Sequence, residues 1–193
     1  MLKRTFDITV SIIAILLSSP IMILIAILIK FTSKGPVFFI QERIGLNGKY
    51  FKMLKFRTML HNSEKKGTGL FSFEDDPRIT NLGHFLRRTS LDEFPQFYNV
   101  LKGDMSVVGP RPHMTEHTKF YSTEVRNFMQ RHKCLPGITG WAQVNGSRGP
   151  TTEEGAMNKR FQYDLYYIKN WNLMLDFYIM IKTFFVILFQ KVD

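Results

Sequence analysis

The chain is organised around the segment RRTSLDEFPQFYN, residues 87–99, in which two arginines and two hydroxyls precede two adjacent carboxylates. Pro95 is tolerated only in the first turn of a helix, so we expect a helix that begins near Asp92 and ends near Gly103. The free backbone N–H groups and the dipole at a helix N-terminus favour negative charge. Because that position also favours a bound phosphate, the segment indicates an anion site next to carboxylates.

Two interpretations of this segment stay open at this point. Ser90 and Glu93 have the spacing of a capping box, and Asp92 alone can cap a helix. Alternatively, a carboxylate beside an anion site is suited to bind Mg²⁺ or to attack phosphorus, and Arg87 or Arg88 would hold the phosphate. Capping residues are far commoner than catalytic ones, so the segment by itself favours the structural interpretation.

The composition limits the classes of protein to which the chain can belong. Its 193 residues suffice for one domain with a core, and 26 basic against 16 acidic side chains give a net charge of +10. Such a charge indicates an anionic partner: nucleic acid, anionic lipid or a phosphorylated substrate. The single cysteine, Cys134, excludes an internal disulfide and a cysteine zinc site, and it is compatible with a reducing compartment.

An apolar segment without charges spans residues 8–29, and basic residues flank both of its ends. As a straight helix it would extend roughly 33 Å, enough to cross a bilayer. Ser19-Pro20 lies in its middle, where proline removes a backbone donor and nearby serine hydroxyls can satisfy the freed carbonyls. A kinked transmembrane helix and a re-entrant helix-break-helix are both compatible with this pattern. Because both ends carry basic residues, we favour the re-entrant form, with both ends cytoplasmic.

The remaining chain predicts a helix-dominated α/β domain with a small sheet, and not a doubly wound nucleotide-binding fold. Strands are expected at residues 37–40 and 50–56 with an Asn47-Gly48 turn between them, and another at residues 105–108. An amphipathic helix is expected over residues 115–133, with Phe120, Tyr121, Val125, Phe128 and Met129 on its core side.

The apolar segment 173–189 carries Asp176 and Lys182, which are costly in a spanning helix. We expect either an amphipathic helix at the membrane interface, with Trp171 and Tyr178 as anchors, or packing against the core of the domain.

Further basic residues are candidates for binding a phosphorylated substrate. Lys55 and Arg57 lie two apart in an extended segment and therefore share one face. Two prolines hold Arg111 on a stiff turn, which lowers the entropic cost of aiming its guanidinium at a phosphate. Arg148 lies in another basic turn that could face a ligand. A solvated basic surface or an ordinary turn is the alternative at each position.

The segment His113-Met114-Thr115-Glu116-His117 matches the H-x-x-E-H pattern of inverted zinc peptidases. Both histidines would lie on one helix face as zinc ligands, with Glu116 as the base and Glu153 or Glu154 as a third ligand. Matches of five residues arise by chance, so a zinc peptidase is kept only as a distant alternative.

Several separate stretches, in order along nearly the whole chain, resemble the bacterial sugar transferase family, the monotopic phosphoglycosyl transferases. These stretches are KRTFD (3–7), SP (19–20), GPVFF (35–39), KFRTM (55–59), DPRIT (76–80), LRRTSLDE (86–93), GDMS (103–106), GPRP (109–112) and PGITGW (136–141). The resemblance implies one catalytic domain at the cytoplasmic face of the bacterial inner membrane, in which residues 1–34 form the re-entrant helix and residues 35–193 the cytoplasmic part.

The resemblance implies transfer of a sugar-1-phosphate from a UDP-sugar to undecaprenyl phosphate. UMP is released, Mg²⁺ is required, and the reaction is the first membrane step of exopolysaccharide synthesis. Asp92 would be the nucleophile that forms a covalent phosphosugar intermediate and a ligand of Mg²⁺, and Glu93 would be its acid/base partner. Arg87 and Arg111 would hold phosphate or nucleotide, and Ser19-Pro20 would mark the break in the membrane helix.

The sugar is less clearly indicated than the reaction. Ser147-Arg148-Gly149 and the pattern YDxxYIxNW at residues 163–171 resemble catalytic domains that start exopolysaccharides with glucose or galactose phosphate. An N-acetylated amino- or deoxysugar is the alternative. Such catalytic domains often follow additional transmembrane helices, so the chain is expected to be a naturally short member or the catalytic domain of a longer one.

The expected partners follow from the same features. Membrane lipids are expected partners, whereas nucleic acid is not, because nucleic-acid binding would not explain the apolar segment at residues 8–29. The sequence leaves the oligomeric state open, a homo-oligomer included.

Overall fold

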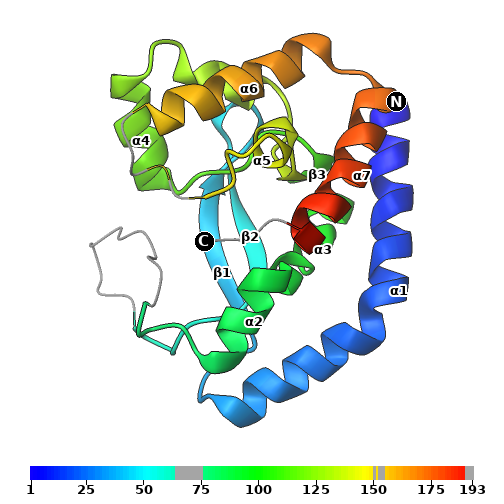
Figure 1. The fold of residues 1–193 in the computed structure, drawn as a ribbon, viewed down its shortest axis with the longest axis vertical. Coiled ribbons are helices and arrows are strands. Elements are labelled where there is room, and N and C mark those ends of the chain that lie inside the picture. Colours follow the sequence, from blue (N-terminus) through cyan, green and yellow to red (C-terminus); the bar gives the residue numbers. More distant parts are fainter. Residues whose placement is uncertain (64–75, 150, 152–154, 190–193) are drawn as a thin grey trace.

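The computed structural model describes residues 1–63, 76–149, 151 and 155–189, and it shows a helix-dominated α/β fold (Figure 1). Single 3₁₀ segments are labelled η. The elements are α1 (Leu2–Thr32), β1 (Phe38–Ile44), η1 (Leu46–Gly48), β2 (Tyr50–Phe56), α2 (Asn81–Thr89), η2 (Leu91–Glu93), α3 (Gln96–Lys102), β3 (Ser106–Val108), α4 (Thr115–Glu124), η3 (Phe128–Lys133), β4 (Gly137–Thr139), α5 (Trp141–Val144), α6 (Ala156–Asn170) and α7 (Leu173–Phe189).

Two small sheets form within this helical frame. β1 and β2 are antiparallel, with Phe38 opposite Phe56 and Ile44 opposite Tyr50. The turn between them places Asn47 and Gly48 at φ values of 53° and 76°, in the left-handed region that these residue types tolerate best. β3 and β4 form a short parallel pair. The predicted hairpin and the helix-dominated α/β class are therefore confirmed, although the strands form two sheets.

Helix α1 is continuous and bends in its middle (Figure 1). Pro20 has no N–H to donate to the carbonyl of Leu16, four residues earlier. The Ser19 hydroxyl donates to that oxygen instead, at 2.9 Å, and the Ser18 hydroxyl donates to the carbonyl of Ala14 at 2.6 Å. The compensation by serine is confirmed, but the expected helix-break-helix is corrected to one bent helix, because these bonds keep the turn around Pro20 helical.

The N-terminal end of α1 is bound to the centre of the domain. Arg4 donates to the carbonyls of Val100 and Leu101 at 2.5 and 2.7 Å and so satisfies free acceptors in the last turns of α3. The fully buried Asp7 accepts a hydrogen bond from the Val107 N–H of β3 at 3.1 Å. These contacts give the first residues of the chain a structural role.

The C-terminal end of α1 is bound to the same domain through Arg57. Its guanidinium donates to the carbonyls of Ser33 and Lys34 at 2.9 and 2.7 Å, directly after the helix ends. Arg57 is buried, and burial lowers its pKa. Both ends of the bent helix are therefore attached to one globular unit.

The main core lies between β2, α3, the β3–β4 pair and the inner face of α7. Helix α7 buries Ile179 and Val186 in this core, and its buried Asp176 forms an ion pair with Lys3 of α1 at 2.7 Å. The partner explains how the helix accommodates a carboxylate that is costly to bury. Packing of α7 against the core, one of the two predicted arrangements, is confirmed.

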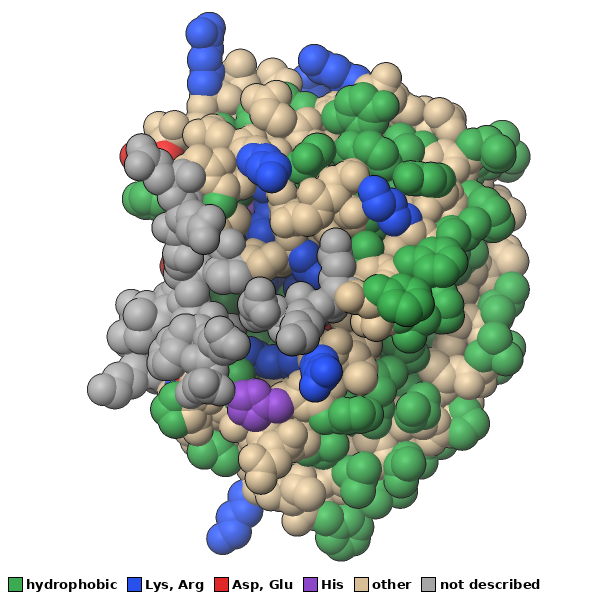
Figure 2. All heavy atoms as spheres, viewed as in Figure 1, with side chains coloured by type: hydrophobic (Ala, Val, Ile, Leu, Met, Phe, Trp, Pro, Cys, Tyr) green, Lys and Arg blue, Asp and Glu red, His purple; other side chains and the backbone are tan. Residues whose placement is uncertain are grey.

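The outer faces of α1 and α7 expose apolar side chains, which gather along one side of the molecule (Figure 2). Among the described residues, one helix, α1, is long and apolar enough to cross a membrane by length and composition. The exposed set includes Leu16, Leu17, Ile23, Leu24, Phe31, Met174, Phe177, Phe184, Leu188 and Phe189. This apolar side is the surface of the protein best suited to contact lipid.

The predicted single helix over residues 115–133 is wrong. Helix α4 ends at Glu124, and the separate segment η3 begins at Phe128 after Asn127, whose φ is 63°. A left-handed residue cannot continue an α-helix, and asparagine tolerates that conformation better than most residues. Phe120 and Met129, expected in the core, are exposed as a result, whereas Val125 and Phe128 are buried.

Candidate active site

Asp92 and Glu93 lie in the 3₁₀ segment η2, between α2 and α3, and not in the first turn of one longer helix. Pro95 precedes the first residue of α3, as its fixed φ allows. Ser90 adopts a left-handed φ of 58° and forms no capping bond with its side chain; its hydroxyl accepts a hydrogen bond from Arg148 instead. The capping-box interpretation is therefore wrong, and the two carboxylates are free for other contacts.

Glu93 is bound by two cations from distant parts of the chain. Lys55 Nζ lies 2.7 Å from Oε1, while Arg111 donates to Oε1 at 2.6 Å and to Oε2 at 3.2 Å. Burial raises the pKa of Glu93, but the charges of Arg111 and Lys55 outweigh burial and hold the pKa well below its usual range. Glu93 is therefore ionised, and its orientation is fixed by bidentate pairing.

Asp92 is buried beside this ion pair but is bound less tightly. Its closest cation is Lys55, whose Nζ lies 4.0 Å from Oδ2, and within the described residues no donor forms a hydrogen bond with its carboxylate. Burial raises the pKa of Asp92, and the charge of Lys55 opposes this shift. A carboxylate with unused oxygens beside several cations is suited to attack an electrophile that carries negative charge.

The hydrogen bonds of the two carboxylates also indicate which of them could bind a divalent cation. Mg²⁺ is usually held by one or two carboxylates together with oxygens of a phosphorylated substrate. Both oxygens of Glu93 are engaged by Arg111, whereas those of Asp92 are available. Of the two adjacent carboxylates, Asp92 therefore fits a Mg²⁺ ligand better.

Arg87 reaches the site from the last turn of α2. Its Nε donates to the hydroxyl of Thr58 at 2.9 Å. Helix α2 approaches this residue closely at Gly83, where a Cβ atom would lie 2.0 Å from the Thr58 carbonyl oxygen. Burial lowers the pKa of Arg87, and the nearby charge of Asp92 opposes this shift. Arg88 is exposed and, within the described part of the chain, forms no ion pair with either carboxylate.

The turn that carries Arg111 is placed by contacts between backbones. A Cβ atom on Gly137 would lie 2.1 Å from the Gly109 nitrogen, and one on Gly109 would lie 2.5 Å from the Leu135 carbonyl oxygen. Only glycine permits such close approach, so the parallel β3–β4 pair brings residues 109–112 against the chain that follows η3.

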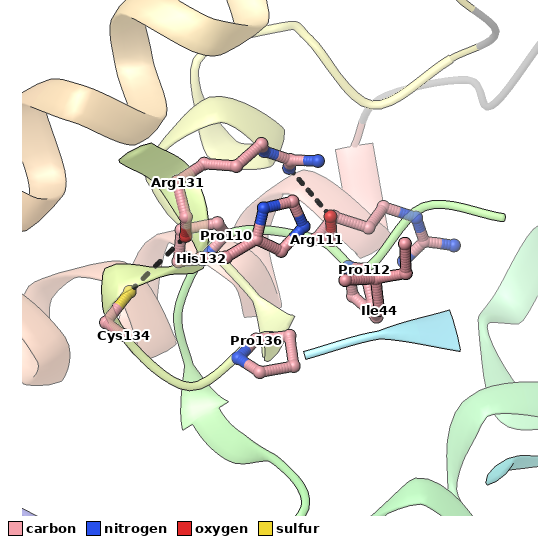
Figure 3. A pocket seen from close by; sticks show the side chains of 8 residues that line it. All are labelled: Ile44, Pro110, Arg111, Pro112, Arg131, His132, Cys134 and Pro136. Atoms are coloured by element: carbon pink, nitrogen blue, oxygen red, sulfur yellow. Dashed lines mark hydrogen bonds between the residues drawn. The ribbon is translucent and has the colours of Figure 1, made fainter. Parts of the chain in front are cut away.

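The backbone of Arg111 is also held by a buried ion pair that the sequence analysis missed. Arg131 donates to the Arg111 carbonyl at 2.7 Å (Figure 3). The same guanidinium binds Asp164 Oδ2 at 2.7 and 3.0 Å. Arg131 and Asp164 are each only 2% exposed. In the sequence, Asp164 was noted only as part of the pattern at residues 163–171. That pattern does not indicate that Asp164 pairs with Arg131.

Arg148 also belongs to the site, through its bond to Ser90. Burial lowers its pKa, and the charge of Glu93 opposes this shift, as expected for a guanidinium beside the ion pair. Of the basic residues singled out in the sequence, the structure thus brings Lys55, Arg87, Arg111 and Arg148 together. It places Arg57 at the end of α1.

The histidine pattern does not assemble a metal site in the described residues. His113 is buried, and its ring centroid lies 6.1 Å from that of Phe128. Burial and the neighbouring Arg131 lower the pKa of His113 well below its usual value. Among the described residues, no three side chains of His, Cys, Asp or Glu lie close enough together to hold a metal ion. Glu153 and Glu154 lie outside the described residues.

Comparison with known proteins gives consistent matches. The family model described as bacterial sugar transferase matches residues 1–190. The chain is 50% identical over 189 residues to the UDP-glucose:undecaprenyl-phosphate glucose-1-phosphate transferase of Xanthomonas campestris pv. campestris, covering 98% of this chain and 39% of that protein. It is 48% identical over 186 residues to the protein of the same name from Escherichia coli (strain K12), covering 96% and 40%.

A relative with a different substrate in its name matches nearly as well. The UDP-N-acetylgalactosamine-undecaprenyl-phosphate N-acetylgalactosaminephosphotransferase of Aeromonas hydrophila is 44% identical over 187 residues, covering 97% of this chain and 44% of that protein. The chain therefore spans about two fifths of the length of these relatives.

Proposed function

This chain belongs to the bacterial sugar transferase family, and we propose that it transfers a sugar-1-phosphate from a UDP-sugar to undecaprenyl phosphate and releases UMP. Two of the compared relatives are named for glucose-1-phosphate, so glucose is the proposed sugar and an N-acetylated sugar the second candidate. The observation that carries the proposal is the pair formed by the buried Asp92 and the half-buried Glu93, with Lys55 and Arg111 at 2.7 and 2.6 Å from Glu93.

In the proposed mechanism Asp92 is the nucleophile. A carboxylate oxygen of Asp92 attacks the sugar-bearing phosphorus of the UDP-sugar, and the bond from that phosphorus to the bridging oxygen breaks, so that UMP leaves with the electron pair. A phosphate oxygen of the acceptor then attacks the same phosphorus and displaces the Asp92 carboxylate. Two steps of this kind let one site serve two bulky substrates in turn.

The cations around Asp92 compensate the charge of the substrate. Arg87, Arg111 and Lys55 surround the carboxylates, where positioned cations stabilise charge that develops on phosphoryl oxygens. Substrate phosphates that compete for Lys55 and Arg111 would weaken the contacts that hold the pKa of Glu93 low. Glu93 would then become a better base for the acceptor phosphate. Mg²⁺ bound through Asp92 would supply further neutralisation of the diphosphate.

We also propose that α1 enters the membrane from the cytoplasmic face and returns to it, with the outer face of α7 at the interface. Attachment of both ends of α1 to one globular unit, through Arg4 and Arg57, supports this arrangement. The bend in the middle of the helix and the apolar side in Figure 2 support it as well.

The proposed topology predicts the labelling of cysteines at the two ends of α1. In a Cys134→Ser background, Leu2→Cys and Thr32→Cys place single thiols at exposed positions. Both thiols are expected to resist a membrane-impermeant maleimide in intact spheroplasts and to react after lysis, because both face the cytoplasm. Labelling of only one of the two in intact spheroplasts would instead establish a spanning helix.

The reaction itself is tested by UMP release from a panel of UDP-sugars, with Mg²⁺ and undecaprenyl phosphate in detergent. Release of UMP that depends on undecaprenyl phosphate, with UDP-glucose as the best donor, is expected. A preference for UDP-N-acetylgalactosamine would move the sugar to the second candidate. No release from any UDP-sugar would reject the proposed function.

His113→Phe is expected to retain at least about half of the wild-type rate of UMP release, because the ring packs on Phe128 and neither ring nitrogen forms a hydrogen bond within the described residues. The zinc peptidase alternative would require His113 as a ligand. A loss of activity together with stoichiometric zinc in the wild-type protein would revive that alternative.

Asp164→Asn tests the buried support of Arg111. The substitution removes one charge from the pair with Arg131 and is expected to lower the free energy of unfolding by about 2 kcal/mol. It should also lower kcat, because the turn that aims Arg111 becomes less rigid. Asp176→Asn is the matched control, since its carboxylate is equally buried and paired but lies outside this network. An equal decrease of kcat in both variants would reject the specific role of Asp164.

A further inference from the structure

A cavity of about 310 Å³ lies beside Glu93 and is lined by residues of α1, α3, the β3–β4 pair, α5 and α7. One end of the cavity is polar and is formed by Ser90, Glu93 and Arg148, which belong to the candidate active site. The walls away from this end are mainly apolar and include Val10, Ala14, Phe97, Met180, Val186 and Ile187.

Two hydroxyl groups in the wall are already satisfied. Thr139 and Thr183 form a hydrogen bond with each other at 2.6 Å, and the Thr183 hydroxyl also reaches the carbonyl of Ile179 at 2.7 Å. Because both hydroxyls already have hydrogen-bond partners in the protein, a molecule bound in the cavity does not need to supply one. This part of the wall is therefore compatible with hydrocarbon.

The walls connect the active site with the apolar side of the molecule. Val10 and Ala14 belong to α1, and Met180 and Val186 belong to α7. The outer faces of the same two helices carry the exposed apolar side chains seen in Figure 2. A hydrocarbon chain held between α1 and α7 would thus have its polar head at the carboxylates and its remainder toward the lipid.

We propose that this cavity binds the isoprene units next to the phosphate of the lipid acceptor, and that Arg148 and Ser90 receive that phosphate beside Glu93. The inference rests on the proposed function. Arg148 offers a cationic donor for a phosphate, while the walls are mainly apolar, with Gln143 as a polar exception, and so suit a hydrocarbon chain over most of their area. A UDP-sugar is polar along its whole length and does not match these walls, so the cavity selects for the acceptor and not for the donor.

The first measurement needs no turnover. Ala14→Phe and Val186→Phe fill the cavity from its two opposite helices, and Ile13→Phe and Leu188→Phe are matched controls at exposed positions on the same helices. Undecaprenyl phosphate in detergent is expected to raise the Tm of the wild-type protein and of both controls, because a ligand that binds only the folded state stabilises it. The shift should be lost in both filling variants.

Kinetics then separates the two substrates. The filling variants are expected to raise KM for undecaprenyl phosphate at least about tenfold, which corresponds to about two methylene groups excluded from an apolar site. KM for UDP-glucose should stay within about twofold of the wild-type value, because these substitutions leave the contacts with the donor substrate unchanged. If the phenylalanine variants do not fold, Ala14→Leu and Val186→Leu reduce the same volume with smaller side chains.

The outcomes distinguish failure of the inference from failure of the proposed function. A Tm shift with undecaprenyl phosphate that persists unchanged in both filling variants would overturn the inference, because the lipid would then bind outside this cavity. An equal increase of both KM values would overturn it too. A wild-type protein that binds undecaprenyl phosphate through this cavity but releases no UMP would support the inference and reject the proposed reaction.

Discussion

Asp92→Asn is expected to lower the rate of UMP release by at least about a thousandfold, the scale of loss when a covalent nucleophile is removed. The amide preserves the shape of the side chain but cannot form the bond to phosphorus. The fold should survive, because no described donor depends on the Asp92 carboxylate. UMP release with purified variant and wild-type protein, alongside their Tm values, measures both effects.

Glu93→Gln provides the comparison for this result. It removes the neighbouring charge that binds Lys55 and Arg111 but leaves the Asp92 carboxylate in place. Slow release by Glu93→Gln together with no detectable release by Asp92→Asn would identify Asp92 as the nucleophile. Release that survives Asp92→Asn in a protein of normal stability would reject this assignment.

Arg111→Ala is the second variant with a large expected effect. A decrease of kcat/KM by about 10²–10³-fold is expected, the range observed when one positioned donor to a developing charge is lost. The substitution removes both hydrogen bonds to Glu93 and the cation that contributes most to its low pKa. Steady-state kinetics with UDP-glucose measures the loss.

The matched control is Arg126→Ala, which removes an exposed arginine between α4 and η3. It is expected to change kcat/KM by no more than about twofold, as is typical of surface positions without shared partners. A comparable loss in both variants would show that the effect comes from the net charge of the protein and not from the position of Arg111.

Local patterns predicted those parts of the fold that depend on neighbouring residues. The Asn47-Gly48 turn fixes the register of the β1–β2 hairpin through its own φ values. Ser19 compensates for Pro20 within a single turn of α1. Both features follow from chemistry within a few residues, so the sequence was sufficient to predict them.

Contacts between distant segments explain the errors. Ser90 had the spacing of a capping residue, but Arg148, 58 residues further along the chain, takes its hydroxyl. Arg57 shares a strand with Lys55, yet the end of α1 captures its guanidinium. The pairing of Arg131 with Asp164 joins residues 33 positions apart, and no local pattern indicated that it supports Arg111.

The identities of Asp92, Glu93 and their cations depended on a different kind of information. Charge and spacing alone favoured a helix cap, and the resemblance along the whole chain reversed that preference. The structure then shows how short stretches that are far apart in the sequence meet at one site. The Glu93 carboxylate in η2 is contacted by Lys55 from β2 at 2.7 Å and by Arg111 from the turn after β3 at 2.6 Å.

The proposed mechanism requires a covalent intermediate on Asp92, and intact-mass measurement can detect it. The protein is incubated with UDP-glucose and Mg²⁺ in the absence of undecaprenyl phosphate. We expect an added mass equal to a hexose phosphate less one water. It should lie on the peptide that contains Asp92 and should be lost when undecaprenyl phosphate is supplied. A protein that releases UMP in the complete reaction but shows no added mass after rapid acid quench would exclude a covalent intermediate on Asp92.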